Sequence, residues 1–437
     1  MRHSEIVVIG GGVAGLNAAR LLAEQGLQVE ILEASHRVGG RAHTLYDGHD
    51  LLPVELGPEF VHGAPGATHE LIREAKLELE PIDDTHHLVR DGGLVDAGDL
   101  WARFGELLAG APDPSHDESA HGYMSRMHMA PDDVQLFALF AEGFYGAPID
   151  DVSIASIAAD ASGLGGDEAQ QQRVRGGYGR VVAWLAERAA RAGVVMHHGC
   201  VVQAIHWQAS PVAIEFLLGT ELAGITADRA IVTLPVGVLH EPGAVRFTPE
   251  LHAHRAALAQ LAMGQVVKLV ACLREPVWMP GAPTELRMVH GGDRGFPTYW
   301  LRTRGTVQQL TAWAGGRHAR ALAECSPGEL AERALDGFAR AVSIDRARVH
   351  AAMRDFHSHD FAADPCARGA YSYTRVGGVG AAEALARPLE DRLFFAGEAT
   401  DARYEGTVAG ALASGTRVAG EVIAVTTPHA RARARAR

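Results

Sequence analysis

The run Ile6-Val-Val-Ile-Gly-Gly-Gly-Val-Ala-Gly15 decides the fold of this chain. Its apolar residues predict a buried strand, and the glycines after them predict a tight turn into a helix. Gly10 permits the sharp turn, and Gly12 lets backbone N–H groups approach a pyrophosphate. Gly15 allows the helix to pack close against the strand. The run therefore predicts the first half of a dinucleotide-binding unit.

The next residues have the spacing that this unit requires. The helix expected over 14–25 ends at Gly26, a common helix stop. A second strand over 28–32 ends in Glu33, which is placed to accept hydrogen bonds from a ribose diol. A glycine cluster alone often marks only a turn, but here strand, helix, second strand and acid follow in order. We assign Val13, Ala14 and Ala34 to the same nucleotide site.

Composition places the chain among ordinary soluble globular proteins. It has 437 residues, 47% of them hydrophobic and 21% charged, which suits two domains. The formal net charge of −13 argues against a nucleic-acid partner. This charge either serves solubility alone or attracts cationic substrates. Four scattered cysteines, the lack of a leader and the lack of an apolar run near ~20 residues predict a cytoplasmic protein without a membrane partner.

The residues after Glu33 indicate which dinucleotide is bound. In Glu33-Ala-Ser-His-Arg37-Val-Gly39-Gly40-Arg41, two arginines lie one short loop past the ribose position, where guanidinium groups can contact a pyrophosphate. The string resembles that of FAD-dependent amine oxidases and their relatives. The resemblance implies FAD rather than a nicotinamide cofactor.

Three further segments resemble the flavin-containing amine oxidase family, which includes monoamine oxidases, polyamine oxidases, L-amino-acid oxidases and lysine-specific histone demethylases. The first, residues 55–63, contains Gly57-Pro58-Glu59-Phe60, and the resemblance implies that it passes the flavin ring. The second is 231–239 with Thr233 and Pro235, preceded by Val202. In the family these residues place a valine backbone at the adenine and a strand end near the flavin.

The third segment lies near the C-terminus, over 394–400 and 404–415. It supplies the predicted cofactor residues Gly397, Glu398, Gly406, Thr407 and Val408. Glu398 closes a strand and could bind ribityl hydroxyls. The helix that starts near Thr407 would point its positive end at the flavin N1–C2=O and stabilise the reduced anion. The matching segments extend from residue 6 to residue 420.

The expected fold is α/β. It comprises a discontinuous Rossmann-type FAD-binding domain and a mixed α+β substrate domain, as in the amine oxidase and glutathione-reductase-like flavoproteins. Both ends of the chain carry cofactor motifs, so they must pack together. We assign 1–79, 173–246 and 370–426 to the FAD domain, 80–172 and 247–369 to the substrate domain, and 427–437 to a flexible tail.

Four side chains are candidates for the chemistry. Lys268 lies in an otherwise apolar strand, where it either reaches solvent or, by the resemblance, holds a water against the flavin N5. Tyr404 resembles one wall of the family's aromatic cage, and Tyr371 is the candidate for the second wall. His62 resembles a histidine that animal polyamine oxidases present to substrate. Plain packing is the alternative for both tyrosines.

Departures from the family narrow the substrate. Ala370 stands where monoamine oxidases attach the flavin through cysteine, which implies non-covalent FAD. No arginine follows Gly57-Pro58 closely, so a carboxylate-bearing substrate is disfavoured. Glu59 and Glu142 are candidates to pair with distal ammonium groups of a polyamine. His197–His198 and His357-x-His359 lack a third ligand, so no metal site is expected.

The resemblance implies an FAD-dependent amine oxidase. A hydride passes from the α-carbon of an amine to flavin N5, the imine hydrolyses to an aldehyde or ketone, and oxygen becomes hydrogen peroxide. A polyamine or another primary or secondary amine is the expected substrate. The alternatives are another FAD oxidoreductase of this fold, such as an L-amino-acid oxidase, a desaturase or a quinone-linked dehydrogenase, or an FAD-stabilised scaffold. Monomer and homodimer both stay open.

Overall fold

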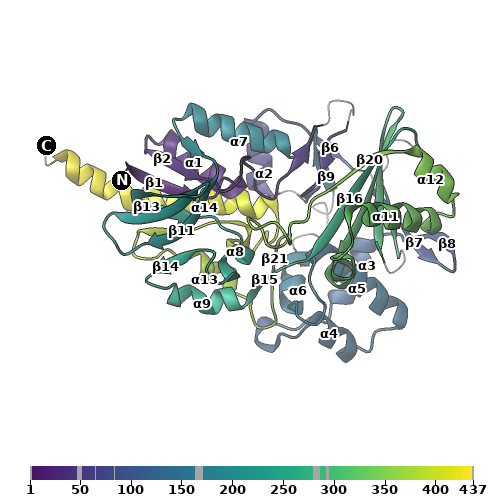
Figure 1. Ribbon diagram of the computed structural model, residues 1–437. Helices are drawn as coiled ribbons and strands as arrows, with labels where there is room; N and C mark the ends of the chain where they lie inside the picture. Colours follow the sequence, from purple (N-terminus) through teal and green to yellow (C-terminus); the bar gives the residue numbers. More distant parts are fainter. Residues whose placement is uncertain are drawn as a thin grey trace.

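The computed structural model consists of two lobes, each built on one large sheet (Figure 1). It describes residues 2–46, 52–63, 65–82, 84–162, 171–278, 286–291 and 295–435. Both ends of the described chain lie on the same lobe, at its outer side.

An eight-stranded sheet forms the lobe that carries both termini. Its strands run in the order β10-β2-β1-β13-β12-β11-β14, and β22 also pairs with β13. Strand β1 is parallel to β2 on one side and to β13 on the other, so the three strands end at one edge. The strands are β1 (Arg2–Ile9), β2 (Val29–Leu32), β10 (Val195–His197), β11 (Cys200–His206), β12 (Val212–Leu218), β13 (Glu221–Val232), β14 (Arg246–Thr248) and β22 (Leu393–Phe395).

Three helices cover one face of this sheet: α1 (Val13–Glu24), α7 (Gly179–Arg191) and α14 (Val408–Arg435). Helix α1 begins directly after the glycine turn and packs against both others. Successive residues of β1 point to opposite faces, so Ile6 and Val8 join the core beneath the helices, whereas Val7 and Ile9 join a second core. Each such side chain contributes about 1.5–3 kcal/mol when it is fully buried.

A seven-stranded sheet forms the second lobe, in the order β20-β16-β19-β18-β17-β7-β8. Its strands are β7 (Asp84–Arg90), β8 (Gly93–Asp96), β16 (Val266–Leu273), β17 (Leu286–His290), β18 (Thr298–Arg304), β19 (Val307–Gly315) and β20 (Met353–Ser358). Helices α10 (Gly316–Leu322), α11 (Pro327–Ala341) and α12 (Arg346–Ala352) lie against it. Ser326 and Glu329 form a capping box that starts α11, and Phe338 of that helix is fully buried in the shared core.

A helical layer lies beside the second sheet, formed by α3 (Leu100–Leu108), α4 (Ala120–Arg126), α5 (Pro131–Tyr145) and α6 (Ile154–Ser162). Its core includes Phe104, Tyr123 and Phe137. Helix α5 ends at Gly146, whose φ of 62° is the left-handed conformation that glycine adopts at helix ends. The remaining elements are β3 (Thr44–Leu45), β4 (Val54–Glu55), β5 (Val61–His62), α2 (Gly66–Glu74), β6 (Leu79–Pro81), η1 (Pro114–His116), β9 (Gln171–Val174), α8 (Val236–His240), α9 (His252–Ala259), β15 (Leu261–Met263), β21 (Ser372–Thr374), α13 (Ala381–Ala386) and η3 (Glu398–Thr400).

The α/β fold class predicted from the sequence is confirmed. The strands of the eight-stranded sheet lie in the three segments assigned to the FAD domain, apart from the last two residues of β14. Helix α14 continues to Arg435, within the segment that the sequence assigned to a flexible tail, and Ala and Arg are both strong helix formers. Residues 436 and 437 lie outside the described part.

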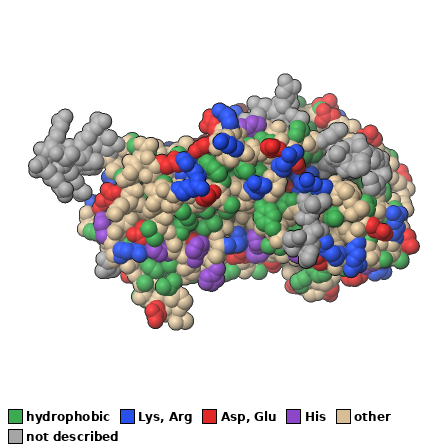
Figure 2. All heavy atoms as spheres, turned by 90° about the horizontal axis from the view of Figure 1, so that it is seen from above, with side chains coloured by type: hydrophobic (Ala, Val, Ile, Leu, Met, Phe, Trp, Pro, Cys, Tyr) green, Lys and Arg blue, Asp and Glu red, His purple; other side chains and the backbone are tan. Residues whose placement is uncertain are grey.

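The expectation that no apolar run approaches the length of a membrane span was wrong. The stretch Val408–Thr426 of α14 is long and apolar enough to span a membrane by length and composition. Half of it is buried inside the protein, where it packs against α1 and η3. The core helix of a soluble protein passes the same test, so this stretch is weak evidence for a membrane span. On the face shown in Figure 2, acidic and basic side chains are interspersed.

Candidate functional site

One cavity of 1130 Å³ lies between the two lobes and collects residues from the whole length of the chain. It exceeds the usual size of a small-ligand pocket, about 300–1,000 Å³. Every residue that the sequence singled out for cofactor binding or chemistry lines it, except Gly15 and Glu142. The lining members are Gly10, Gly12, Val13, Ala14, Glu33, Ala34, Arg37, Gly39, Gly40, Arg41, Gly57, Pro58, Glu59, Phe60, His62, Val202, Thr233, Pro235, Lys268, Tyr371, Gly397, Glu398, Tyr404, Gly406, Thr407 and Val408.

The glycine turn between β1 and α1 forms one end of this cavity. Gly10 has a φ of 108°, and a Cβ there would lie 2.5 Å from the Thr233 hydroxyl. A Cβ on Gly15 would strike the Gly10 carbonyl, which accounts for Gly15 packing below the cavity rather than lining it. A Cβ on Gly12 would meet no atom within 4 Å. The space above Gly12 is therefore open for a ligand, as a pyrophosphate requires.

Glu33 lies at the end of β2 with a carboxylate that the backbone fixes. It accepts hydrogen bonds from Gly11 N at 2.6 Å and from Ser35 N at 2.8 Å, one on each oxygen. Each carboxylate oxygen has two lone pairs, so both retain one for a ribose hydroxyl. The side chain lines the cavity beside the glycine turn, and the arrangement fits the adenosine half of a dinucleotide.

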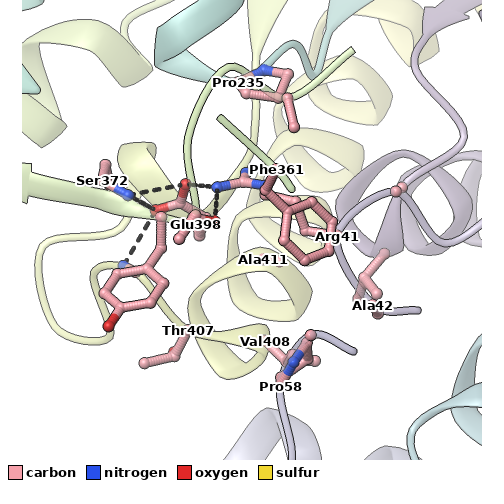
Figure 3. Close-up of a pocket in the computed structure, with 18 of the residues that line it drawn as sticks. Arg41, Ala42, Pro58, Pro235, Phe361, Ser372, Glu398, Thr407, Val408 and Ala411 are labelled. Carbon is pink, nitrogen blue, oxygen red and sulfur yellow. Dashed lines mark hydrogen bonds and ion pairs between the residues drawn. The ribbon is translucent and has the colours of Figure 1, made fainter. Parts of the chain in front are cut away.

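Two arginines follow in the sequence but have different partners. Arg41 Nη1 lies 2.6 Å from Glu398 Oε1 and donates to the Ala370 carbonyl at 3.1 Å (Figure 3). The other oxygen of Glu398 accepts from Ser372 Oγ at 2.5 Å and Gly406 N at 3.1 Å. Burial lowers the pKa of Arg37, and Asp364 and Glu33 partly offset the effect. Arg37 thus faces the cavity without an ion pair as close as that of Arg41, and it fits a pyrophosphate better.

The N-terminus of α14 opens onto the same cavity. Thr407 precedes the helix, donates to the Tyr404 carbonyl at 2.8 Å and accepts from Gly410 N at 3.1 Å. Thr407 and Val408 line the wall below Glu398 (Figure 3). The positive end of a long helix at this wall favours negative charge on a bound group. This is the wall at which the sequence placed the flavin.

Lys268 is buried, with 4% of its side chain exposed, and its ammonium has specific partners. It lies 3.0 Å from Glu59 Oε2 and donates to the Gly57 carbonyl at 3.1 Å. Arg173 binds the other oxygen of Glu59 at 2.6 Å, and Trp300 Nε1 donates to both oxygens at 3.2 Å. Burial favours neutral Glu59, but Lys268 and Arg173 outweigh it and lower its pKa to about 2. Neither Arg173 nor Trp300 carried a signal in the sequence.

The two candidate cage tyrosines differ in their surroundings. The Tyr371 hydroxyl donates to the Phe144 carbonyl at 2.8 Å, which fixes the ring, and burial raises its pKa. Tyr404 is partly exposed, with the Arg403 guanidinium 5.1 Å from its ring centroid. His62 lies 5.1 Å from Phe144, ring centroid to ring centroid. The cavity is further lined by the aromatic side chains of Trp101, Phe140, Trp300 and Trp313.

Two acids in the cavity wall were missed by the sequence analysis. Asp160 accepts a hydrogen bond from Tyr145 at 3.1 Å, and Glu405 accepts one from Thr374 at 2.8 Å. Burial raises the pKa of Asp160 to about 6. Burial, with a contribution from Glu398, raises the pKa of Glu405 to about 8. Their hydrogen-bond partners are hydroxyl groups, and no motif could have singled them out.

The proposed ammonium partners Glu59 and Glu142 are both engaged with protein cations. Glu142 pairs with Arg317 at 3.0 Å and does not line the cavity. Glu59 already holds Lys268 and Arg173. Neither carboxylate is therefore available to pair with a substrate ammonium.

Comparison with known proteins gives a consistent result. A family model described as flavin containing amine oxidoreductase matches residues 13–423. Polyamine oxidase 1 of Oryza sativa subsp. japonica is 28% identical, over 97% of this chain and 97% of its own length. Lysine-specific histone demethylase 1 homolog 1 of the same organism is 29% identical over 96% of this chain. The chain spans only 52% of that demethylase homologue.

Solved structures show the same fold. Putrescine oxidase bound to putrescine superposes with a TM-score of 0.79 at 21% identity, and cyclohexylamine oxidase from Brevibacterium oxydans IH-35A with 0.80 at 22%. Each comparison covers 97% of this chain and 99% of the other. The likeness extends over both lobes.

Proposed function

The chain belongs to the flavin containing amine oxidoreductase family, and from that premise we propose that it is an amine oxidase that binds FAD without a covalent link. The observation that carries the proposal is a single cavity in which a dinucleotide cradle, the buried Lys268 and an aromatic wall meet. The polyamine oxidase and putrescine oxidase relatives support an amine as the substrate. Ala370 supports the non-covalent attachment, because no cysteine stands there.

Bound FAD would supply a two-electron acceptor for the amine, so that the product would be an imine that hydrolyses to an aldehyde or ketone, with oxygen as the final acceptor and hydrogen peroxide as its product. The protein's own residues bind and orient the reactants. Lys268 presents an ammonium that can hold a water in the cavity, and Glu59 with the Gly57 carbonyl fixes its position. Tyr371 and Tyr404 offer aromatic faces that admit an alkyl chain and exclude water.

The cavity wall favours primary or secondary amines with apolar chains, and it leaves room for a second charge. Trp101, Phe140 and Phe144 line it with apolar surface. Asp160 and Glu405 are the acids that could receive a distal ammonium, because their hydrogen-bond partners are hydroxyls rather than cations. A diamine or polyamine therefore fits the proposal as well as a monoamine.

Anaerobic mixing of the yellow holoenzyme with monoamines, polyamines and amino acids tests the proposal. We expect loss of the flavin absorbance with at least one amine and its return, with hydrogen peroxide, when air is admitted. The Lys268→Met variant should slow flavin reduction or reoxidation strongly, whereas Arg255→Met, an exposed cation, should not. Failure of every amine to bleach the flavin would refute the proposal and favour an FAD-stabilised scaffold.

Turnover should rise with pH. The amine must be neutral for hydride loss, and alkylamines have pKa values near ~10, like lysine. The rate of flavin reduction, followed by stopped flow between pH 6 and 10, measures this step without interference from oxygen or product release. A flat profile of that rate would contradict the requirement for a neutral amine.

A further inference from the structure

Three side chains outside the cofactor cavity gather on one face of the second sheet. Strands β16 and β20 are antiparallel neighbours in a register that sets Cys272 opposite Asp355 and Val270 opposite His357. Residues two apart on a strand share a face, so Asp355 and His357 project on the same side as Cys272. The sequence showed only His357-x-His359 and no third ligand. Asp355 lies two residues before His357 on β20, and Cys272 comes from the neighbouring strand β16.

The geometry is that of a metal-ligand set. The Cys272 Sγ, an Asp355 carboxylate oxygen and a His357 ring nitrogen all lie within 4.8 Å of one another. His357 Nε2 is 3.8 Å from Asp355 Oδ1, too far for a hydrogen bond. Bonds of about 2.0–2.3 Å in a tetrahedral zinc site place ligand atoms about 3.3–3.7 Å apart. Only a small closure would bring the three groups to that spacing.

Two of these ligand atoms are buried and make no hydrogen bond to the described residues. Asp355 Oδ1 and His357 Nε2 are both shielded from solvent and have no hydrogen-bond partner within the described part of the chain. A buried carboxylate oxygen and a buried imidazole nitrogen that make no hydrogen bond cost stability, and their mutual contact at 3.8 Å is too long to supply one. A cation between them satisfies both atoms at once. The other carboxylate oxygen, Oδ2, receives Arg354 Nε at 3.2 Å, which orients the group.

The backbone shows a local adjustment at the same place. The β16–β20 register shifts between Cys272 and Leu273, a bulge that falls next to Asp355. Bulges often re-aim a side chain at a functional position. Cys272 is fully buried in a small core with Val54 and Leu56, whereas Asp355 and His357 are partly exposed and leave an approach for water.

A second group of similar composition has a different explanation. Glu332, Asp336 and His350 also lie within 4.8 Å of one another. Arg346 already fills the space between the two acids, at 2.6 Å from Asp336 and 3.3 Å from Glu332. That group is an ion-pair network with its own cation. In the cluster on β16 and β20, Arg354 contacts Oδ2 of Asp355, and no lysine or arginine of the described residues forms an ion pair with Oδ1.

We propose that Cys272, Asp355 and His357 bind one Zn²⁺ ion, with water as the fourth ligand. Thiolate and imidazole select zinc over Mg²⁺ and Ca²⁺, which prefer oxygen ligands. The thiol loses its proton to solvent on binding, so one thiolate, one carboxylate and one divalent cation sum to zero charge in this half-buried site. The ion ties edge strand β20 to β16, the strand that carries Lys268. It thereby stabilises the start of the segment that leads to Phe361 and Tyr371 in the cavity wall.

Metal content measured on tag-free, FAD-loaded protein tests the proposal. The protein is stripped with a chelator, exposed to ZnCl₂ in the presence of a weak competing chelator, desalted and analysed for zinc. We expect wild type to retain one Zn²⁺ per chain more than Cys272→Ala, Asp355→Asn or His357→Gln. The controls Cys325→Ala and His206→Gln remove one thiol and one imidazole elsewhere, and they should retain the wild-type content. The controls matter because the chain has 23 histidines.

Co²⁺ provides an independent readout. With CoCl₂ in place of zinc, wild type should show a thiolate-to-metal absorption band that Cys272→Ala lacks and Cys325→Ala keeps. Zinc should also raise the Tm of wild type but not of the three cluster variants, and retained FAD absorbance shows that each variant is folded. Equal zinc content in wild type and all three cluster variants would overturn the proposal.

Discussion

The ion-pair cluster around Glu59 allows a quantitative prediction about which of its members matters most for stability. Glu59→Gln keeps the size of the side chain but removes the carboxylate shared by Lys268 and Arg173. Both cations would then be buried without an anion, with 4% and 8% of their side chains exposed. Removing one partner of a buried pair costs about 3–5 kcal/mol. Lys268→Met should cost less, because Glu59 keeps Arg173 and Trp300.

The pKa of Glu59 gives a second estimate of the same energy. Burial raises this pKa and the cations lower it, for a net value of about 2 against an ordinary 4.5. A carboxyl with a lowered folded-state pKa contributes stability that is fully present above pH 4.5 and is lost as the pH falls toward 2. The difference corresponds to about 3 kcal/mol. The deficit of Glu59→Gln relative to wild type should therefore shrink between pH 5 and pH 2.

Denaturant unfolding of the holoenzymes measures these differences. Two FAD concentrations separate a loss of cofactor affinity from a loss of intrinsic stability, because ligand binding adds a concentration-dependent contribution. Glu78→Gln, which removes an exposed partner of Arg175, is the matched control and should cost about 1 kcal/mol or less. The reasoning is refuted if Glu59→Gln is no less stable than Lys268→Met, or if its deficit is the same at pH 3 as at pH 7.

Three further predictions concern the cavity. Gly12→Leu should fold, since the φ of −72° at position 12 suits any residue, but it should lose FAD because the leucine side chain enters the open space. The control Gly105→Ala, on the exposed surface of a helix, should keep FAD. Flavin absorbance after desalting measures both outcomes. Glu405→Gln should flatten the pH dependence of the free energy of unfolding. Because the pKa of Glu405 is raised to about 8 in the folded protein, the wild-type free energy of unfolding falls by about 1.4 kcal/mol per pH unit as the pH rises from 5 to 8. A variant with the wild-type slope would contradict this. Tyr371→Phe leaves the Phe144 carbonyl without its donor and should cost about 1 kcal/mol in unfolding experiments, whereas amine turnover should fall substantially only in Tyr371→Leu if the ring face guides the substrate.

The cofactor end of the site could be predicted from sequence because its chemistry depends on the backbone. At Gly10 a Cβ would clash with Thr233, and at Gly12 a side chain would fill the space for the pyrophosphate. Both positions therefore require glycine, and their spacing can be recognised in the sequence. Glu33 follows because it ends the neighbouring strand. The helix α1 was predicted to within one residue at each end for the same reason: a glycine turn starts it and Gly26 follows its end.

The substrate end could not be predicted in the same way. Tertiary packing of three separate elements and the loop before α14 brings four residues to the cavity or its ion pairs: Arg173, Trp300, Asp160 and Glu405. No local spacing records that Glu59 would meet Lys268 and Arg173, so its carboxylate was taken as available for substrate. The Cys272 cluster was missed similarly, because strand pairing rather than sequence distance brings its members together.

The contact between Arg41 and Glu398 joins residues that are far apart in the order of synthesis. During translation the glycine turn, β1 and α1 leave the ribosome long before β22 and α14. The wall formed by Glu398, Thr407 and Val408 does not exist until then, and β1 gains its neighbour β13 only halfway through. A nascent chain can therefore begin the adenosine cradle, but it cannot close the rest of the site around FAD. FAD binding is consequently a late event in the synthesis and folding of this chain. The lobe that carries both termini must avoid aggregation until α14 has been synthesised.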